Sequence, residues 1–446
     1  MNPPTNAQHR LSTYTRGIWP LVWPIMLSNL SVPLLGAVDT AILGHLPAAR
    51  YLGAVAVGAS VLTLVFWSLG FLRMGTTSLV APAVGREDWE ESLALWLRSA
   101  VLALALAAAL LAASGWVIPF AIGWMAPEPA AAQLAISYCQ IRFLSAPATL
   151  LNYTLIGWFI GQQDTRRPLV ILVFTNAINI ALDLLFILGL GLNSDGAAWA
   201  SVCAEYAALG LGLWLLWARI GRLTLRQPWR LRLRELRRLE CYLPLIRVNR
   251  HLFVRTFCLL TVFTFFTAQG ARAGTHVVAA NAILLQLLML TSHALDGFAH
   301  AAEALCGKAR GAADRAEFVR VSLATTAMAL ATALLISLVF ALGKPLWLEL
   351  FTQIPEVLEE AGAQFHWIIA LPLLAIWGYQ LDGIFLGSGR TAAMQYTMLI
   401  CTVGVFFPLW WLTTGLGNTG LWLAFSLFNA ARGLVMGALF WRNLRQ

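Results

Sequence analysis

Residues 157–165 read GWFIGQQDT and residues 383–391 read GIFLGSGRT, so the two stretches share the pattern GxFxGxxxT. They lie about 226 residues apart, close to half the length of the chain. At nearly the same offset, Gly70-Phe71 recurs as Gly297-Phe298, and Pro147 recurs as Pro372. Each match alone is weak, but together they predict that the chain is an internal duplication.

The composition indicates what surrounds the two repeats. The 446 residues are 59% hydrophobic and only 11% charged, whereas a soluble domain carries about 25% charged residues. A bilayer core requires about 20 apolar residues per helix, and this length divides the chain into twelve predicted spans. They lie near 17–43, 51–82, 94–122, 132–160, 168–192, 196–218, 243–269, 276–306, 319–343, 362–386, 393–415 and 419–441.

The repeat and the spans together predict the fold class, an all-α polytopic membrane protein of two pseudo-symmetric six-helix bundles. Six spans per repeat is an even number, so both repeats enter the membrane from the same side. They are then related by an axis along the membrane normal, with the substrate path between them. We expect an N-terminal lobe at 1–218, a basic linker at 219–240 and a C-terminal lobe at 241–446.

The charges predict the orientation. The net charge of +9 comes almost entirely from arginine, and eight arginines lie between Arg219 and Arg238. Basic residues flank alternate connections, and the opposite connections include acidic stretches such as TQIPEVLEE at 352–360. The positive-inside rule therefore predicts an inner-membrane protein with both termini and the linker in the cytoplasm. The linker is either an amphipathic helix on the lipid headgroups or a solvated loop. Without a soluble basic domain, we expect no nucleic-acid partner.

Three polar residues in the predicted N-terminal spans are candidates for ion coupling. A charged group at mid-bilayer costs about 2.5–3.5 kcal/mol, so each one is a functional hypothesis. Asp39 lies in the first span, where removal from water disfavours the charged carboxyl and allows a proton gradient to load it. Asn179 and Asp183 lie four residues apart on one helix face. The alternatives are a carboxylate that never titrates and a pair that only joins helices.

Further acids in apolar segments form a secondary set of candidate coupling or ion sites: Glu205, Asp296, Glu303 and Asp382. Candidate counter-ions are Arg73, Arg142, Arg247, Arg250, Arg255, His293 and His300. The alternative for most of these groups is an ion-pair network that fixes the packing. Asp382 differs from the others because its repeat equivalent is the apolar Ile156, so the symmetry does not require it.

Pro20, Pro24 and Pro33 all precede Asp39 in the first span. A proline inside a helix removes a backbone hydrogen bond and kinks the helix. The three prolines make this span a candidate moving element, with Pro24 and Pro33 as hinges. Static kinks are the alternative interpretation.

Several motifs are absent from the sequence. It contains no Walker A, HExxH or DDxxD pattern, and its six cysteines are scattered without a CxxC spacing. We therefore expect a transporter rather than an enzyme, with no metal site and no cofactor other than a coupling ion.

Several segments along nearly the whole chain resemble the DinF branch of the multidrug and toxic compound extrusion (MATE) family. They are VDTAILGHL, FLRMGTTSLVAPAVG, IRFLSAP, GWFIGQQDTRRPL, NAINIALDLL, GAAWASVCAEY, NRHLFVRT, LDGFAHAAEA and QLDGIFLGSGRT. One departure is His251 within NRHLFVRT, where the resemblance leads us to expect an acid. This histidine weakens the case for a sodium site in the C-terminal lobe.

The resemblance implies two six-helix bundles in a V and an antiporter that exports xenobiotics in exchange for protons or sodium. It implies that Asp39 switches between proton and drug, with Asn179 and Asp183 as polar partners, and that the first span bends at Pro24. Asp382 matches the acids to which sodium binding is assigned in sodium-coupled relatives.

We therefore expect a monomeric, proton-coupled exporter of small organic compounds, with cationic ones favoured. The alternatives are a sodium-coupled exporter and a flippase for lipid-linked precursors.

Overall fold

The computed structural model describes residues 17–31, 36, 38, 42, 49–125, 128–224 and 238–444. All elements in these ranges are helices, in agreement with the predicted fold class. Ten helices there are long and apolar enough to cross a membrane, and α5 with α6, bent by 51°, forms an eleventh span. These eleven match the predicted spans from 51–82 onward. Of the first predicted span, residues 17–31 form a helix.

The chain forms two compact units, each with its own internal contacts. We call Leu27–Ile246 the N-terminal bundle, and Arg247–Gln446 together with Met1–Met26 the C-terminal bundle. This grouping assigns the start of the first helix to the C-terminal bundle, whereas the predicted lobes assigned it to the first lobe. The predicted lobe boundaries stay a prediction, and most of the predicted linker falls outside the described residues.

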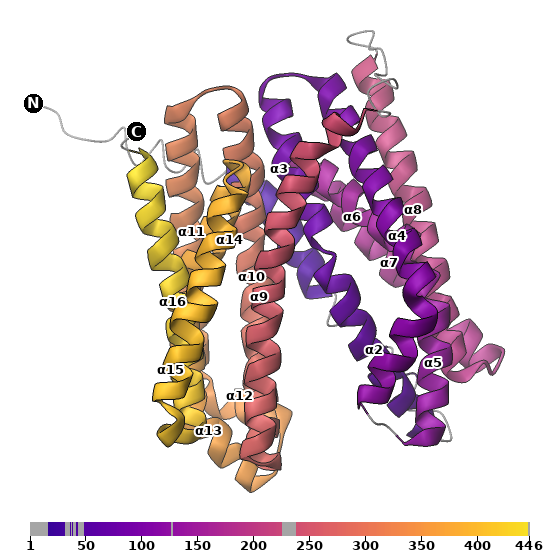
Figure 1. Ribbon diagram of the computed structural model, residues 1–446, viewed down its shortest axis with the longest axis vertical. Helices are drawn as coiled ribbons and strands as arrows, with labels where there is room; N and C mark the ends of the chain where they lie inside the picture. Colours follow the sequence, from indigo (N-terminus) through magenta and orange to yellow (C-terminus); the bar gives the residue numbers. More distant parts are fainter. Residues whose placement is uncertain are drawn as a thin grey trace, which may run out of the picture. The chain divides into compact units, whose positions relative to one another are not determined.

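The N-terminal bundle is built from long helices, and breaks or bends interrupt three of its spans. Figure 1 shows its helices from α2 to α8. Its elements are α2 (Ala49–Ser68), α3 (Phe71–Gly85), α4 (Trp89–Met125), α5 (Pro129–Phe143), α6 (Ala146–Gly161), α7 (Arg166–Asp183), η1 (Leu184–Gly189) and α8 (Asn193–Thr224). A short break at Leu69-Gly70 separates α2 from α3. The π-helical η1 begins directly after Asp183, and π-helical turns occur often at functional sites.

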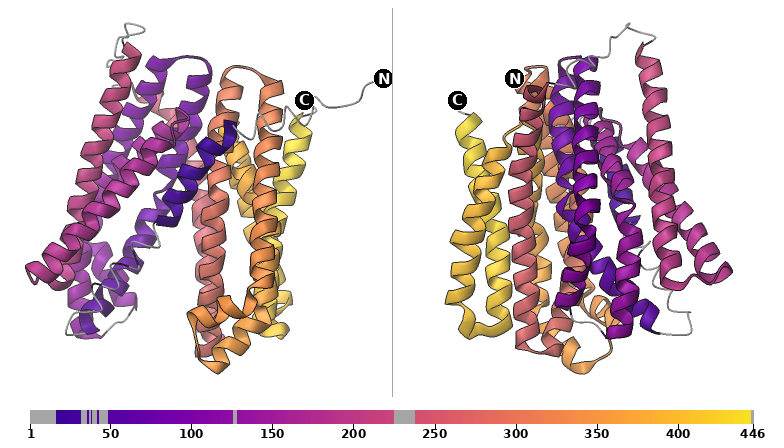
Figure 2. Two further views of the ribbon diagram at one scale, coloured as in Figure 1. Left: turned by 180° about the vertical axis from the view of Figure 1, so that it is seen from behind. Right: turned by 45° about the vertical axis from the view of Figure 1, so that its right-hand side comes forward.

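The long helices of the C-terminal bundle run roughly along one direction, and the short α12 lies at the end opposite the C-terminus (Figures 1 and 2). The elements are α9 (Leu243–Ala273), α10 (Thr275–Gly311), α11 (Arg315–Leu342), α12 (Lys344–Phe351), α13 (Pro355–Gly387), α14 (Thr391–Leu399), η4 (Ile400–Phe406), α15 (Phe407–Leu412), η5 (Thr414–Leu416) and α16 (Gly417–Leu444). The short η3 (Leu239–Tyr242) and the first turn of α9, up to Ile246, group with the N-terminal bundle. The π-helical η4 interrupts the same span of this repeat that η1 interrupts in the first.

The repeated GxFxG motif has the same packing role in both bundles. In the N-terminal bundle, a Cβ atom on Gly157 would collide with the carbonyl oxygen of Arg73 on α3. In the C-terminal bundle, a Cβ atom on Gly383 would collide with the carbonyl oxygen of Ala299 on α10. Glycine at these positions allows two helix backbones to approach closely, as small residues do in membrane bundles. The duplication therefore preserves the helix contacts as well as the number of spans.

The start of the first helix packs against α10. Ile18 and Val22 are buried together with Leu295 and Phe298 of α10. A Cβ atom on Gly297 would lie 2.5 Å from Met26 Cγ, so this helix pair also depends on a glycine. These apolar contacts explain why the segment up to Met26 groups with the C-terminal bundle.

Candidate functional site

The predicted site residues divide between the two bundles, and part of the set cannot be placed. Asp39 and Pro33 lie outside the described residues. Pro24 is buried within the helix at 17–31 and belongs to the segment that packs with the C-terminal bundle. Asn179, Asp183 and Glu205 lie in the N-terminal bundle, and the other predicted acids lie in the C-terminal bundle.

Asn179 and Asp183 occupy the buried face of α7. Their residues are 3% and 1% exposed, although both are polar. Asn179 Nδ2 donates a hydrogen bond to Ser201 Oγ of α8 over 3.4 Å. Asp183 is the last residue of α7, and the π-helical η1 begins at the next residue, Leu184. The structure thus places an amide and a carboxyl one turn apart, both shielded from the surroundings of the bundle.

Glu205 extends this polar surface along α8. It follows Ser201 by four residues and therefore lies on the same face of the helix. Asn152 Nδ2 of α6 donates to Glu205 Oε2 over 3.0 Å and to the Glu205 carbonyl oxygen over 3.1 Å. Arg142 of α5 interacts electrostatically with Glu205. Polar groups of α5, α6, α7 and α8 therefore lie near one another. The sequence indicated the pair Asn179 and Asp183 and the separate candidates Glu205 and Arg142, but not the contact of Glu205 with Asn152.

Asp382 is held between two arginines in the C-terminal bundle. Arg255 of α9 contacts Asp382 Oδ2 through Nη2 and also donates from Nε over 3.2 Å. Arg432 of α16 donates from Nη2 to the same oxygen over 2.9 Å. The side chains of Arg255, Asp382 and Arg432 are only 12%, 8% and 3% exposed. Both ion pairs are therefore largely shielded from water.

Aromatic and hydroxyl groups complete the surroundings of Arg432. Its guanidinium lies 5.9 Å from the ring centre of Tyr379 and 5.7 Å from that of Phe428, within the range of cation–π contacts. The Tyr379 hydroxyl lies 2.8 Å from Ser292 Oγ of α10. Asp296, also on α10, interacts electrostatically with Arg255. The sequence analysis predicted Asp382, Asp296 and Arg255 but missed Arg432.

A signal for Arg432 was present in the sequence. It is a charged residue in the interior of the apolar segment 419–441, and such residues are costly in a bilayer unless they have a partner. The energetic cost that identified the buried acids as candidates applies equally to basic residues within the spans, so it also indicates Arg432.

Glu303 belongs to a different environment from Asp382. It is completely buried on α10, and its Oε2 atom lies 3.6 Å from Nδ1 of His300. A Cβ atom on Gly387 would lie 2.5 Å from the Glu303 carbonyl oxygen, so this residue sits at the close contact of α10 with α13. The location fits a group that supports helix packing.

Comparison with known proteins gives the family. One family model, described as MatE, matches residues 24–185 and matches again at residues 252–412. The chain belongs to the MATE family. The two matches also support the internal duplication, because one model describes both halves. MATE proteins are transporters, so the expectation of a transporter rather than an enzyme is confirmed.

Individual MATE relatives match over nearly the whole chain. DNA damage-inducible protein F of Escherichia coli is 38% identical over 443 residues, which cover 97% of this chain and 94% of that protein. A MOP superfamily transporter from Pyrococcus furiosus has a TM-score of 0.85 at 21% identity, covering 96% of each chain. A MATE crystal structure in the straight conformation has a TM-score of 0.84 at 21% identity, covering 96% of this chain and 95% of that one. These matches confirm the resemblance and the predicted MATE fold.

Proposed function

We propose that the chain is a proton-coupled antiporter that exports small organic compounds, with cationic ones as preferred substrates. Its place in the MATE family supports the export of such compounds, and its spans support a multi-pass location in the cell inner membrane. The observation that carries the proposal is the burial of Asn179 and Asp183 one helical turn apart on α7.

The chemistry of this pair suits a group that changes its protonation state. An asparagine amide donates a hydrogen bond to a carboxylate and accepts one from a protonated carboxyl, so it stabilises both forms. Burial raises the energetic cost of the charged form, which couples protonation to any change in solvent access. In the proposed mechanism, Asp39 exchanges a proton for the cationic substrate, and Asn179 and Asp183 are its polar partners.

The C-terminal bundle gives a reason to prefer protons to sodium. Asp382 already contacts Arg255 and Arg432, so a sodium ion at this carboxylate would meet two guanidinium charges. His251, in place of the expected acid, lies 3.0 Å from Thr391 Oγ1 through its Nδ1 atom. Both features disfavour a sodium site at Asp382, so sodium coupling is the second candidate.

The first helix is the proposed moving element. Its residues Ile18 and Val22 pack on α10 of the C-terminal bundle, whereas Ser31 accepts a hydrogen bond from Asn176 of α7 over 3.2 Å. Pro24, which lies between these contacts, has no backbone N–H to donate within the helix. Bending at Pro24 would therefore change the contacts on one side of this residue without breaking the contacts on the other side.

Transport assays in everted membrane vesicles test the proposal. We expect an imposed proton gradient to drive accumulation of a fluorescent organic cation. We expect Asp39→Asn and Asp183→Asn to slow this accumulation at least about a hundredfold, the lower end of the range for a lost proton-transfer group. Glu356→Gln is the matched control, because Glu356 is an exposed acid in the first turn of α13. Full gradient-driven transport by Asp39→Asn would refute the proposed coupling.

Two further arms separate the alternatives. Transport that requires sodium and continues in the presence of a proton uncoupler would identify the sodium-coupled carrier. Absence of transport for a panel of organic cations, together with movement of a lipid-linked pyrophosphate between leaflets, would identify the flippase.

A further inference from the structure

The C-terminal bundle contains two adjoining hollows that the proposed transport mechanism does not use. The first, of about 340 Å³, lies at the C-terminal ends of α10, α13 and α16 and at the start of α11. We call it the arginine pocket. The second, of about 620 Å³, lies between α11, α13 and α16, and we call it the apolar groove. Phe440 of α16 lines both hollows, so the two adjoin at this residue.

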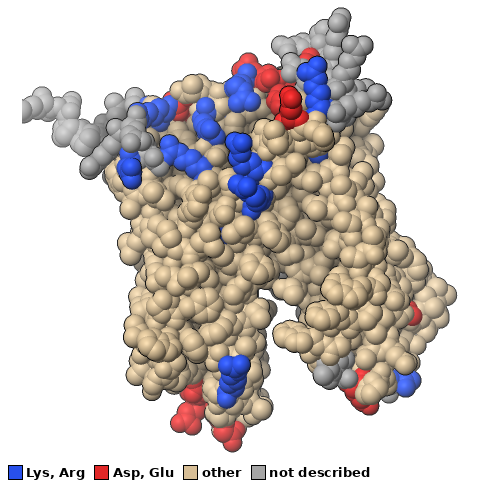
Figure 3. Space-filling view, in the orientation of Figure 1, with Lys and Arg blue, Asp and Glu red and all other residues tan. Residues whose placement is uncertain are grey.

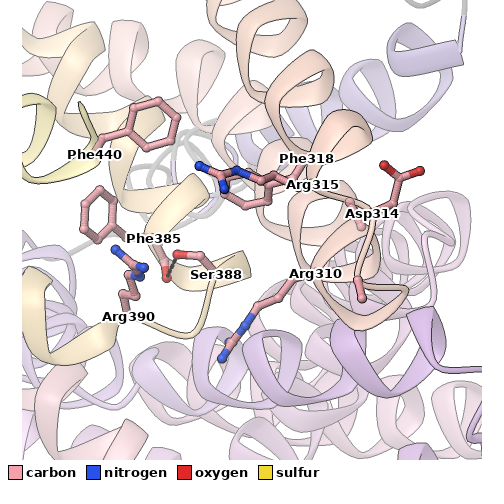
Figure 4. Close-up of a pocket in the computed structure, with 10 residues that line it drawn as sticks. Arg310, Asp314, Arg315, Phe318, Phe385, Ser388, Arg390 and Phe440 are labelled. Atoms are coloured by element: carbon pink, nitrogen blue, oxygen red, sulfur yellow. Dashed lines mark hydrogen bonds between the residues drawn. The ribbon is translucent and has the colours of Figure 1, made fainter. Parts of the chain in front are cut away.

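The arginine pocket has the chemistry of an anion site. Its lining includes Arg310, Arg315 and Arg390, with one carboxylate, that of Asp314. Figure 4 shows Arg390 beside Phe385 on one side and Arg310 and Arg315 on the other, with Ser388 between them. Arginine side chains are well suited to phosphate because several donors point the same way. The excess of three guanidinium groups over one carboxylate favours a ligand with negative charge.

Local contacts involve two of these side chains, those of Asp314 and Arg310. Asp314 Oδ1 caps α11 by accepting a hydrogen bond from the Glu317 backbone N–H over 2.8 Å, which occupies part of the carboxylate. Gly389 has a φ of +67°, and a Cβ atom there would collide with Nη1 of Arg310. The turn after α13 therefore favours glycine for its backbone conformation, and the Arg310 guanidinium packs against this turn.

The apolar groove has the dimensions of one membrane leaflet. It follows α16 from Ala430 to Trp441, which spans about 17 Å at about 1.5 Å per residue. Half of a bilayer core about 30 Å thick is about 15 Å. Gly437 leaves space in the groove, since the only atom near its Cβ position is Leu381 Cδ1 at 3.9 Å, and Leu434, which is 75% exposed, forms part of the edge. The lining is thus largely apolar, with Ser322, Thr326 and Gln380 as its polar members.

The arginine pocket lies at the end of the bundle where a lipid headgroup would be. Figure 3 shows lysine and arginine side chains gathered at the end where α10 meets α11, which the positive-inside rule assigns to the cytoplasm. Basic pockets between transmembrane helices on this side bind anionic headgroups. A phosphate at the guanidinium groups and a chain in the groove would be joined past Phe440.

We propose that the arginine pocket and the apolar groove together bind one anionic membrane phospholipid. The phosphodiester contacts Arg310, Arg315 and Arg390, and an acyl chain lies in the groove beside Gly433 and Gly437. Charge sets the preference for an anionic headgroup, and the length of the groove sets the preference for a lipid over a soluble phosphate.

Native mass spectrometry of the full-length protein in detergent tests this site. We expect the protein to bind phosphatidylglycerol more tightly than phosphatidylcholine and to show no binding of glycerol phosphate at equal concentration. The triple variant Arg310→Gln/Arg315→Gln/Arg390→Gln should lose about a hundredfold in phosphatidylglycerol affinity, at about fivefold for each cation near a headgroup.

The matched control removes the same charge from the same end of the bundle. Lys308→Gln/Arg320→Gln/Arg442→Gln changes three basic residues that line neither hollow, and we expect wild-type affinity. Equal losses in the two triple variants would overturn the site in favour of general surface charge. Equal binding of phosphatidylcholine, or of glycerol phosphate, would overturn the anionic-lipid assignment.

A second variant tests the groove independently of charge. A Cβ atom on Gly437 has its nearest neighbour at 3.9 Å, so Gly437→Leu places a side chain in the groove without a backbone clash. We expect weaker phosphatidylglycerol binding with an unchanged melting temperature in detergent. Wild-type phosphatidylglycerol affinity in this variant would show that the acyl chain lies elsewhere and would overturn the proposal.

Discussion

Asp382 shares its Oδ2 atom between Arg255 and Arg432, and Asp296 also interacts electrostatically with Arg255. Aromatic rings beside Arg432 add cation–π contacts. Removal of one member of a buried ion pair is strongly destabilising, whereas replacement of the whole group by apolar residues is often tolerated. These contacts therefore indicate that Asp382 holds α9, α13 and α16 together.

We expect Asp382→Asn to destabilise the protein by about 3–5 kcal/mol, because it removes the carboxylate charge that two buried guanidinium groups share. The double variant Asp382→Asn/Arg432→Met should melt at a higher temperature than Asp382→Asn alone, since it removes one of these charges. Thermal melting in detergent measures both, with the exposed acid Glu356→Gln as control. A single Asp382→Asn variant as stable as the wild type would contradict this assignment.

At the scale of the helix, glycine decides how closely α3 approaches α6 and α10 approaches α13. Gly157 and Gly383 each face a backbone carbonyl of the neighbouring helix. In a membrane, where the hydrophobic effect does not drive helices together, such close packing is a main source of stability. The repeated motif that first indicated the duplication is therefore a packing motif.

Gly383→Ala should destabilise the C-terminal bundle by about 1–3 kcal/mol, because the added methyl group overpacks the contact with Ala299. Gly210→Ala in α8 is the matched control: nothing lies within 4 Å of its Cβ position, and alanine favours a helix over glycine by about 1 kcal/mol. Melting temperatures in detergent should thus shift in opposite directions. A Gly383→Ala variant as stable as Gly210→Ala would rule out the proposed close contact.

At the scale of the whole molecule, the two bundles share helix order and packing motifs but differ in their buried charges. The N-terminal bundle places Ile156 where the C-terminal bundle has Asp382. The polar groups of α5 to α8 include amides and carboxyls, whereas the group around Asp382 is dominated by arginine. Duplication preserved the scaffold, and the chemistry of the two halves diverged.

The predicted orientation can be checked by labelling single cysteines in a variant without the six native ones. Ala312 lies in the turn between α10 and α11, near Lys308, Arg310 and Arg315, and Gln353 lies between α12 and α13 near several glutamates. Because basic loops stay in the cytoplasm, an impermeant maleimide should label Gln353→Cys in intact cells and Ala312→Cys in everted vesicles. The reverse pattern would contradict the predicted orientation.

The amino-acid sequence alone was sufficient to predict the number of spans, the duplication and the family. These features follow from bilayer thickness, which fixes the length of each apolar segment, and from a glycine motif repeated in register. Asn179 and Asp183 could be paired in advance because both lie on one helix, where a spacing of four residues fixes their common face.

Which distant charges meet depends on how the helices pack, and this was not predictable from the sequence. Asp382 lies 127 residues from Arg255 and 50 from Arg432 in the chain, and the three meet because α9, α13 and α16 present these faces to one another. The arginine pocket likewise combines groups from α10, α11 and the turn after α13. Hydropathy gives the length of each helix but not its rotation about its own axis, and that rotation determines the partners of its side chains.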